Sequence, residues 1–332
     1  MTAGAQTAEL VRAGGPHVPQ LMARIEGRLR DAAAGNGPVL AEHGGTTIAS
    51  GGKRLRPLLV LLAAGPPDGE QQADALVRAG AAVELVHSAT LVHDDVLDAA
   101  GLRRGRPTVV ATAGPAMAIA TGDLLFAQAF AGMTQAGGAA GADPAAAVRT
   151  LSDACSALAR GELAQRADAW DADVTVERYL HRCELKTARL FEAACLLGAL
   201  AVGEEPGGIG RFGRGIGLAF QLLDDVLDVA GPAERTGKHR GTDLLDGTVT
   251  LPFIVARRRS NELAALDPRT VTTPQEAERV CDMIAATGAL DDARAMALEL
   301  VAEAKRELPA ELDAGRRAAL ELVADGVVKR YS

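Results

Sequence analysis

Aromatic residues are scarce in this chain: Phe, Tyr and Trp together make up 3% of its 332 residues. Its core must therefore be built mainly from Ala, Leu, Val and Ile, within a hydrophobic content of 48%. A chain of this length can bury a large core. Because no Pro/Ser-rich linker or abrupt change in composition divides it, we predict a single domain over residues 1–332, with residues 1–17 flexible.

Cysteines and blocks of basic residues are also few. The four cysteines, Cys155, Cys183, Cys195 and Cys281, lack metal-binding spacing, which predicts reduced thiols in the core of a cytoplasmic protein. The formal net charge is −8 and the basic residues form no long runs. These two features argue against nucleic acid as a partner.

The sequence also lacks the long apolar run of a membrane span. A span needs roughly 20 apolar residues, and the run at 57–64 is cut off by Gly65-Pro66-Pro67. Residues 1–16 lack the charged-then-apolar pattern of a signal peptide. We therefore expect a soluble, cytoplasmic protein without a membrane span.

Helix signals, in contrast, occur from end to end. Asp143-Pro144 predicts a helix start with an N-cap and a proline at the first position, and Thr273-Pro274-Gln275-Glu276 predicts a capping box. Apolar spacings of three and four recur in four stretches, 21–29, 151–163, 179–200 and 296–308. Because alternating strand patterns with hairpin turns are absent, we predict an all-α fold, a bundle of roughly ten or more helices.

The pentapeptide Asp-Asp-Val-Leu-Asp occurs twice, at residues 94–98 and 224–228, each time after a long apolar stretch. Residues i and i+4 share a face of a helix, so Asp94 and Asp98 should project together, as should Asp224 and Asp228. Three carboxylates within five residues repel one another, and bound cations relieve that repulsion. Two such clusters facing each other would hold several hard cations and a substrate rich in phosphate oxygens.

A single acidic cluster at the end of a helix is usually a solvated terminus. Here the preceding residues, 81–92 and 215–223, are apolar on nearly every side, so both helices are expected to be buried. Carboxylates carried into a protein interior need partners. We therefore interpret both acidic clusters as functional.

Residues 231–250 break the helical pattern. This segment is Gly-rich and polar, contains Lys238, His239 and Arg240, and directly follows the second acidic cluster. An ordinary helix connection would explain it. A basic, flexible strip beside carboxylates is, however, more typical of a lid over bound phosphate.

Basic residues accompany the acidic ones. In Gly51-Gly52-Lys53-Arg54-Leu55-Arg56-Pro57, three cations stand ahead of, or within the first turn of, an apolar helix. Guanidinium and backbone N–H groups at such a terminus suit a polyanion without a metal. Arg103-Arg104 follows the first acidic cluster closely. Solvated surface arginines are commoner, but this position favours contact with a diphosphate.

In this combination the chain resembles the trans-isoprenyl (polyprenyl) diphosphate synthases. The matching motifs fall in order between about residues 50 and 255: Gly-Gly-Lys-Arg-Leu-Arg-Pro, the first acidic cluster with Arg103-Arg104-Gly105, Gly122-Asp123, Gly161-Glu162, Lys186-Thr187, Phe220-Gln221 with the second acidic cluster, and Gly241-Thr242-Asp243-Leu244. The family's helical bundle around a central cavity would cover nearly the whole chain. The resemblance implies a homodimeric transferase of isoprenoid biosynthesis that condenses isopentenyl diphosphate with an allylic diphosphate.

The resemblance also implies roles for the residues that match. The two acidic clusters would bind about three Mg²⁺ ions together with diphosphate. The implied metal-site residues are Asp94, Asp95, Asp98, Asp224, Asp225 and Asp228. Among them, Asp95 would lie next to the ligands of the first cluster, and Asp225 would be a supporting or alternate ligand. Residues for the diphosphate of isopentenyl diphosphate are implied at Lys53, Arg56, His87 and Arg104. The allylic diphosphate would be held by Arg103, Lys186 and Lys238. Catalytic roles near the developing carbocation are implied for Lys186, Thr187 and Gln221.

The chemistry accounts for these residue types. Breaking an allylic C–O bond leaves a carbocation and a highly charged diphosphate, which Mg²⁺ and fixed cations stabilise. Mg²⁺ takes one or two carboxylates together with substrate phosphates and water, which fits Asp clusters without His or Cys. One departure concerns Thr248, where many relatives carry a lysine; Lys238, His239 or Arg240 would have to compensate.

Three other interpretations remain. A class I terpene cyclase would share the fold and the first acidic cluster, but would normally replace the second with an Asn/Ser/Glu triad. A catalytically silent subunit of a heteromeric synthase would usually have lost one cluster. A structural bundle that stores metal would not explain Lys53, Arg56, Arg103 and Arg104.

Product length is expected to depend on the helix that carries Asp94. Relatives with short products have an aromatic residue five positions before the first Asp, where this chain has Ala89. The positions further back are also without an aromatic residue: Val86, Leu85, Ala82 and Ala81. We therefore predict a long product, heptaprenyl or beyond, with loose membrane contact for its release. Alternatively, Leu85 or a residue of 117–130 would block the tunnel. The product would then be geranylgeranyl or another short chain.

Overall fold

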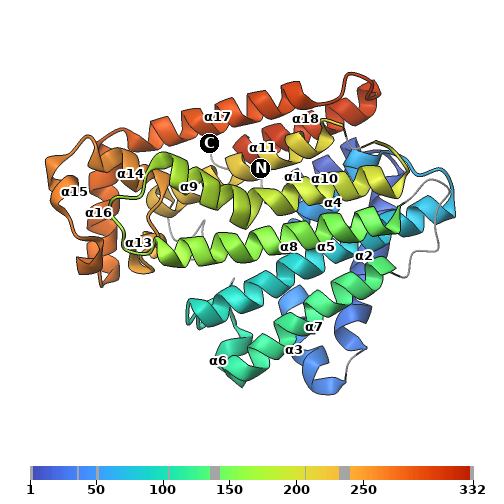
Figure 1. Cartoon of the computed structure of the whole chain (residues 1–332), viewed down its shortest axis with the longest axis horizontal. Coiled ribbons are helices and arrows are strands. Elements are labelled where there is room, and N and C mark those ends of the chain that lie inside the picture. Colours follow the sequence, from blue (N-terminus) through green and yellow to red (C-terminus); the bar gives the residue numbers. More distant parts are fainter. Residues whose placement is uncertain are drawn as a thin grey trace. The chain divides into compact units, whose positions relative to one another are not determined.

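The computed structural model describes residues 3–35, 37–49, 52–103, 105–134, 143–205, 207–231 and 240–329. The regular structure of these residues is almost entirely helical (Figure 1). The predicted all-α class is therefore confirmed. They fall into two compact units, each made of several chain segments: residues 1–155, 190–213 and 308–323 form the first unit, and 156–189, 214–307 and 324–332 the second. The single domain remains a prediction.

The first unit begins with seven helices of the N-terminal half. These are α1 (Ala3–Ala13), α2 (His17–Ala34), α3 (Pro38–Ala49), α4 (Leu55–Ala64), α5 (Glu70–Leu97), α6 (Val109–Ala113) and α7 (Pro115–Thr134). Helices α5 and α7 lie side by side (Figure 1), and α5 also packs on α2 and α4. Leu10 of α1 is buried, while the flexibility of residues 1–17 remains a prediction.

The expectation that hairpins are absent is wrong at one place. Directly after α5, β1 (Leu102–Arg103) and β2 (Arg106–Pro107) pair antiparallel, with Arg103 opposite Arg106. Ala99 has a left-handed backbone (φ 49°), and the Ala100 N–H donates to the Asp95 carbonyl at 2.9 Å. The chain therefore turns back on the end of α5, which returns Arg103 to the first acidic cluster.

The described residues from 143 onward are likewise mostly helical. Its helices are α8 (Pro144–Ala167), α9 (Val176–Cys183), a π-helix (Glu184–Ala188), α10 (Arg189–Ala201), α11 (Ile209–Ala230), α13 (Thr242–Leu245), α14 (Leu251–Arg257), α15 (Asn261–Ala265), a 3₁₀-helix (Pro268–Thr270), α16 (Pro274–Ala286), α17 (Ala289–Glu307) and α18 (Ala314–Lys329). Within the second unit, α14 packs on α16 and α17.

Both predicted helix starts are confirmed. The Asp143 carboxylate accepts from the Ala145 N–H at 2.9 Å, and α8 begins with Pro144. At α16 the Thr273 hydroxyl accepts from the Glu276 N–H, and the Glu276 carboxylate accepts from the Thr273 N–H, which completes the capping box. These helices start where their first N–H groups find side-chain acceptors.

Two helices of the described residues are long and apolar enough to cross a membrane by length and composition. They are α5, whose apolar window is 72% buried, and α7, whose window is 33% buried. The sequence expectation counted only uninterrupted apolar runs. Measured over a whole helix, these two stretches are long and apolar enough for a span. The burial of α5 is that of a core helix, since residues 79–86 are buried on every side.

Candidate active site

The first acidic cluster lies at the C-terminal end of α5. Asp94 is half-buried and Asp98, the C-cap residue, is exposed, whereas Asp95 is 5% exposed. The Arg103 Nε donates to Asp95 Oδ1 at 2.7 Å. The middle carboxylate is therefore buried and ion-paired, while the role of Asp94 and Asp98 as metal ligands stays a prediction. Because the carbonyl end of a helix is electrically negative, carboxylates there are unfavourable unless cations offset them.

A histidine and a glycine support this cluster from the side. His93 precedes Asp94, and its Nε2 lies 3.2 Å from the Ile119 carbonyl and 3.6 Å from Asp123 Oδ1. A Cβ atom on Gly122 would lie 2.2 Å from His93 Nε2. Gly122 is thus required so that α7 can approach the imidazole, which gives Gly122-Asp123 a physical role.

The basic segment leads into α4, as predicted. Lys53 and Arg54 precede the helix and Arg56 lies in its first turn. The Arg56 guanidinium stacks on the ring of Phe191, 4.6 Å from its centroid, and Phe191 is fully buried. Since cation–π stacking orients a guanidinium, Arg56 is held by an apolar neighbour that sequence reasoning did not identify. His87 is half-buried on α5.

The second acidic cluster lies in the last two turns of α11. Asp224 and Asp228 are half-buried, whereas Asp225 is 4% exposed. The Tyr179 hydroxyl donates to Asp225 Oδ2 at 2.6 Å, and Gln221 Nε2 donates to Oδ1 at 2.8 Å. Burial, followed by the charge of Asp243, raises the pKa of the Asp225 carboxyl to about 8, although both donors oppose this shift.

Gln221 connects this cluster to the π-helix. The buried Thr187 hydroxyl donates to Gln221 Oε1 at 2.6 Å, so Thr187, Gln221 and Asp225 form one chain of hydrogen bonds. A π-helical turn inside a longer helix frequently marks a functional site. The structure therefore brings together Thr187, Gln221 and Asp225, which were singled out separately from the sequence.

Lys186, also in the π-helix, forms an ion pair with Glu162 of α8. Burial alone would raise the pKa of Glu162, but the ion pairs with Lys186 and Arg166 outweigh it and lower that pKa. A Cβ on Gly161 would lie 2.4 Å from the Lys186 backbone nitrogen. Gly161 is therefore the close-approach point that seats Lys186, and Glu162 is the carboxylate that orients it.

After the second cluster, residues 240–250 form several hydrogen bonds within the protein. The Asp243 N–H donates to Asp228 Oδ2 at 3.2 Å, and α13 follows Gly241, whose backbone is left-handed (φ 73°). Arg240 donates to the Val229 carbonyl at 2.8 Å and to Asp282 at 2.9 Å. Arg240 is therefore committed to protein acceptors, while the lid over bound phosphate stays a prediction.

Three predicted cations lie outside the described residues: Arg104, Lys238 and His239. Their assignments to diphosphate remain predictions. The proposed compensation for Thr248 by Lys238 or His239 also remains one.

Two of the four predicted length-determining residues, Ala82 and Leu85, line a cavity in the first unit. Ala81, Ala82 and Leu85 of α5 contribute to a cavity of about 300 Å³ that also has Ala129 and Gly132 of α7 in its wall. Ala89 and Val86 are fully buried closer to Asp94. Ala81 and Ala82 thus leave space beside α5, and Arg28, Asp31, Arg78 and Gln128 supply polar atoms to the wall of this cavity. The role of these positions in product length stays a prediction.

The two acidic clusters offer carboxylate oxygens as possible metal ligands. Among the described residues, no group of three or more His, Cys, Asp or Glu side chains is gathered into a ready cage. Mg²⁺ seldom uses such a cage, because it retains waters and binds one or two carboxylates together with substrate phosphates. The half-buried carboxylates of Asp94, Asp224 and Asp228 therefore suit Mg²⁺ better than a metal that needs a full set of protein ligands.

By fold and site residues, the chain is a prenyltransferase of the all-helical class. It is 40% identical over 255 residues to heptaprenyl diphosphate synthase component 2 of Geobacillus stearothermophilus, covering 75% of this chain and 77% of the relative. It is 34% identical to a geranylgeranyl diphosphate synthase of Methanosarcina mazei, covering 85% and 87% of the two chains. The family model of the polyprenyl synthetases matches residues 38–286. The chain therefore belongs to the polyprenyl synthetase family.

Solved structures agree with this assignment. The crystal structure of a polyprenyl synthase from Caulobacter crescentus, complexed with calcium and isoprenyl diphosphate, superposes with a TM-score of 0.87. It is 33% identical in sequence, and 98% of each chain is covered. The isoprenoid synthase fold is therefore confirmed over essentially the whole chain.

Proposed function

We propose that this protein condenses isopentenyl diphosphate with an allylic diphosphate and that it requires Mg²⁺, about three ions in the loaded site. The observation that carries the proposal is the repeated acidic cluster. In both copies the middle carboxylate is buried and hydrogen-bonded, whereas the i, i+4 pair is less deeply buried. Bound Mg²⁺ would neutralise the diphosphate as it departs.

The residues around the second cluster have distinct parts in this reaction. Lys186, oriented by Glu162, places its ammonium against the allylic diphosphate. Thr187 and Gln221 present oxygen atoms that stabilise the allylic cation without capturing it. Asp225, held by Tyr179, keeps the Gln221 amide in one orientation. Such fixed dipoles stabilise developing charge without reorganising during the reaction.

Isopentenyl diphosphate is assigned to the basic segment of the first unit. Lys53, Arg56 and His87 bind its diphosphate there, with Arg104 as a further cation. No carboxylate cluster is needed at this position, because charge-assisted hydrogen bonds hold a diphosphate without a metal. The double bond then attacks the allylic cation, and the departing diphosphate accepts the proton that is lost.

The product is proposed to be long, heptaprenyl or beyond. Support comes from the cavity beside α5, where Ala81 and Ala82 leave space and none of the described residues in its wall is aromatic. The name of the Geobacillus relative is consistent with this length, whereas that of the Methanosarcina relative favours the shorter alternative. Residues Ala89, Val86, Leu85 and Ala82 are the proposed length determinants.

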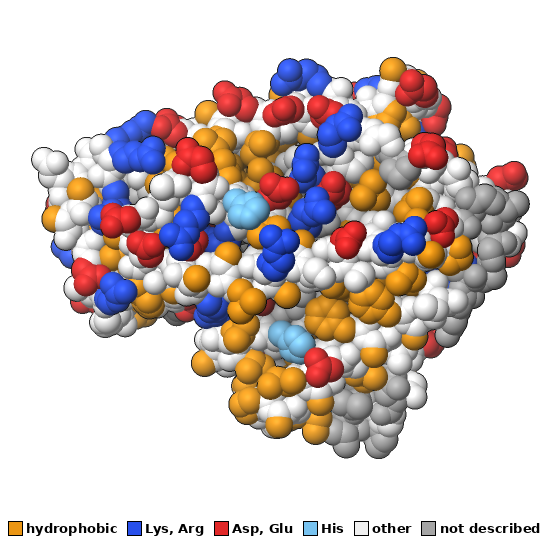
Figure 2. All heavy atoms as spheres, in the orientation of Figure 1, with side chains coloured by type: hydrophobic (Ala, Val, Ile, Leu, Met, Phe, Trp, Pro, Cys, Tyr) orange, Lys and Arg blue, Asp and Glu red, His pale blue; other side chains and the backbone are white. Residues whose placement is uncertain are grey.

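A homodimer and a cytoplasmic location are also proposed. Figure 2 shows hydrophobic side chains gathered over the part of the surface formed by α6 and α7. Ile119 of α7 is 47% exposed, and Leu102 of the same unit is 65% exposed. Exposed apolar surface of this kind is typical of a protein–protein interface, and a second copy is its proposed occupant. Loose membrane contact would assist release of a long product.

Incubation of the purified chain with Mg²⁺, isopentenyl diphosphate and allylic primers, followed by sizing of the products, tests the proposal. A ladder of linear polyprenyl diphosphates is expected. Cyclic hydrocarbons would indicate a terpene cyclase. Turnover only after a second component is added would indicate the silent-subunit interpretation, which the word "component" in the Geobacillus relative's name makes worth testing. Metal binding without turnover under either condition would indicate a storage bundle.

A further inference from the structure

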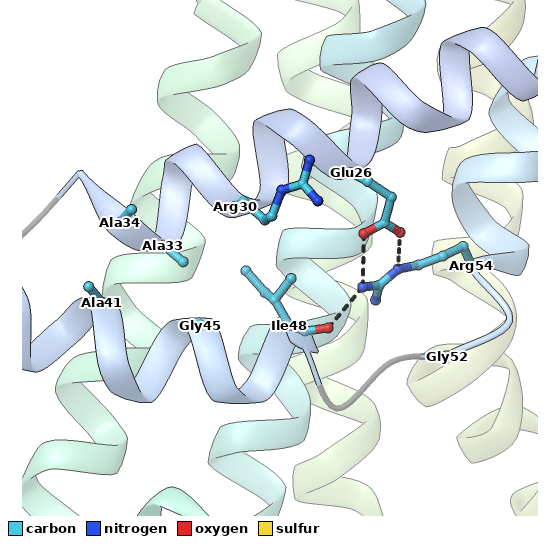
Figure 3. A pocket seen from close by; sticks show the side chains of 9 residues that line it. All are labelled: Glu26, Arg30, Ala33, Ala34, Ala41, Gly45, Ile48, Gly52 and Arg54. Carbon is cyan, nitrogen blue, oxygen red and sulfur yellow. Dashed lines mark hydrogen bonds and ion pairs between the residues drawn. The ribbon is translucent and has the colours of Figure 1, made fainter.

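Arg54 stands between the two cations assigned to isopentenyl diphosphate, Lys53 and Arg56, yet its side chain is engaged elsewhere. Its Nε donates to Glu26 Oε1 at 2.6 Å, and its two terminal nitrogens donate to Glu84 Oε1 at 2.7 Å and to the Ile48 carbonyl at 2.8 Å. Figure 3 shows the Arg54 guanidinium facing the Glu26 carboxylate as a fork, with a second contact to Oε2 at 3.4 Å. These bonds use four of the five N–H donors of an arginine.

The charges around Arg54 also show that its guanidinium is engaged within the protein. The Arg54 side chain is only 11% exposed, and Glu84 is 5% exposed. Burial alone would lower the pKa of Arg54, but the two carboxylates outweigh it and raise that pKa. One cation matched by two carboxylates offers no net positive charge to an anion. Arg54 is therefore not a diphosphate ligand, although it lies in the middle of the basic segment.

The backbone at Arg54 explains why a clamp is needed there. Arg54 has a left-handed conformation (φ 47°, ψ 38°), which residues other than glycine seldom adopt. It is also the N-cap residue of α4, and its carbonyl accepts the first helical hydrogen bond, from the Leu58 N–H at 3.0 Å. The turn at residue 54 thus sets the direction of Lys53 on one side and of Arg56 on the other.

The three acceptors come from three different helices. Glu26 belongs to α2, Ile48 to α3 and Glu84 to α5. On α5, Glu84 lies one turn before His87 and ten residues before Asp94. Arg54 therefore ties the basic segment to the helix that carries the first acidic cluster.

We propose that Arg54 is a positioning residue that, by clamping Glu26 and Glu84, fixes Lys53 and Arg56 relative to His87 and Asp94 for the diphosphate of isopentenyl diphosphate. This inference rests on the proposed function of the basic segment. It predicts that loosening the clamp weakens binding of isopentenyl diphosphate more than it changes turnover. The allylic substrate, assigned to other residues, should be affected much less.

The decisive variant is Glu84→Gln, which leaves Arg54 and its charge in place. If Arg54 only positions its neighbours, a weaker clamp should raise the KM for isopentenyl diphosphate about fivefold or more, with kcat changed less than twofold. If Arg54 instead binds the diphosphate, releasing its guanidinium from Glu84 should lower that KM. The sign of the change therefore separates the two roles.

Arg54→Lys is the second variant. A lysine keeps the charge but cannot form a planar fork with Glu26 while reaching Glu84. The KM for isopentenyl diphosphate should rise about tenfold or more, and equilibrium binding of isopentenyl diphosphate to the metal-free protein should weaken by the same factor. An Arg54→Lys enzyme with wild-type KM and binding would overturn the proposal. Circular dichroism checks that each variant is folded. If Arg54→Lys does not fold, the nearly isosteric Glu84→Gln still tests the proposal.

Arg24→Lys is a matched control. Arg24 also joins α2 to α5, through Glu70 at 2.8 Å and through Asp74, but far along the helix from the basic segment. It should leave both KM values unchanged; an equal rise in Arg24→Lys would show that general helix packing is responsible. Arg56→Ala separates the proposed binding function of the basic segment from the positioning role of Arg54. If Arg56→Ala leaves the KM for isopentenyl diphosphate unchanged, the proposed function of the segment fails; if it raises that KM while the clamp variants do not, only the positioning role fails.

Discussion

Two phenylalanine substitutions on α5 provide a quantitative test of how product length is set. Ala89 and Ala82 are both fully buried, at 0% and 1% exposure, and they lie seven residues apart. Seven residues are about two helical turns, so the two positions share a face and are separated by about 10.5 Å along the axis. If one isoprene unit spans roughly one turn of about 5.4 Å, the product of Ala82→Phe should be about two units longer than that of Ala89→Phe.

The absolute lengths follow from the position of Asp94. We expect about three or four units for Ala89→Phe and about five or six for Ala82→Phe, at one unit per turn. From Asp94 back to Glu70, where α5 begins, the helix runs about 36 Å at 1.5 Å per residue, enough for about seven units. The assay uses dimethylallyl diphosphate as primer, excess isopentenyl diphosphate and Mg²⁺, with products dephosphorylated and sized by chromatography.

Val83→Phe is the control for overpacking. Val83 is fully buried on the same helix but does not line the cavity beside Ala81, Ala82 and Leu85. An extra ring in a packed core costs about 1–3 kcal/mol, so Val83→Phe should lower Tm while leaving product length unchanged. The reasoning would be refuted if Ala89→Phe and Ala82→Phe gave the same product, or if Val83→Phe shortened it equally.

Three further predictions concern the site and the core. Asp94→Ala should lower kcat by about 10³-fold or more, because charge neutralisation by a metal is worth several kcal/mol, while Tm stays equal or rises; a near wild-type rate would contradict the two-cluster mechanism. Arg56→Ala should raise the KM for isopentenyl diphosphate about ten- to hundredfold, from a lost charge-assisted bond of about 1.5–3 kcal/mol, and the KM for the allylic primer much less; equal effects on both would contradict the assignment. Burial raises the pKa of Cys183, Cys195 and Cys281 to about 12 each, so these thiols should not react with Ellman's reagent at pH 8 until the protein is unfolded; rapid labelling of the native protein would show that they are accessible.

Features with a local cause could be predicted from the sequence. The pairing of Asp94 with Asp98 follows from 3.6 residues per turn, and the capping box at Thr273 needs only residues four apart or fewer. The position of Arg56 in the first turn of α4 likewise follows from the apolar run that succeeds it. Each of these inferences depends on spacing within one helix, which the sequence displays directly.

Features made by contacts between distant segments could not be predicted in this way. Tyr179 reaches Asp225 across 46 positions, and Arg54 reaches Glu26 and Glu84 across 28 and 30. Nothing in the spacing around Tyr179 distinguishes it from an ordinary core aromatic. The ion pair of Lys186 with Glu162 had one indirect signal in the sequence, the glycine at position 161. The Lys186 backbone passes so close to this position that a side chain there would clash with it.

The two acidic clusters share a sequence but differ in how their middle carboxylate is supported. Asp95 receives the guanidinium of Arg103, a positive partner, whereas Asp225 receives two neutral donors, Tyr179 and Gln221. Burial and then the charge of Asp243 raise the pKa of Asp225 to about 8, although Tyr179, Gln221 and the charge of Arg182 oppose this shift. Identical pentapeptides therefore place their middle carboxylates in two different electrostatic environments.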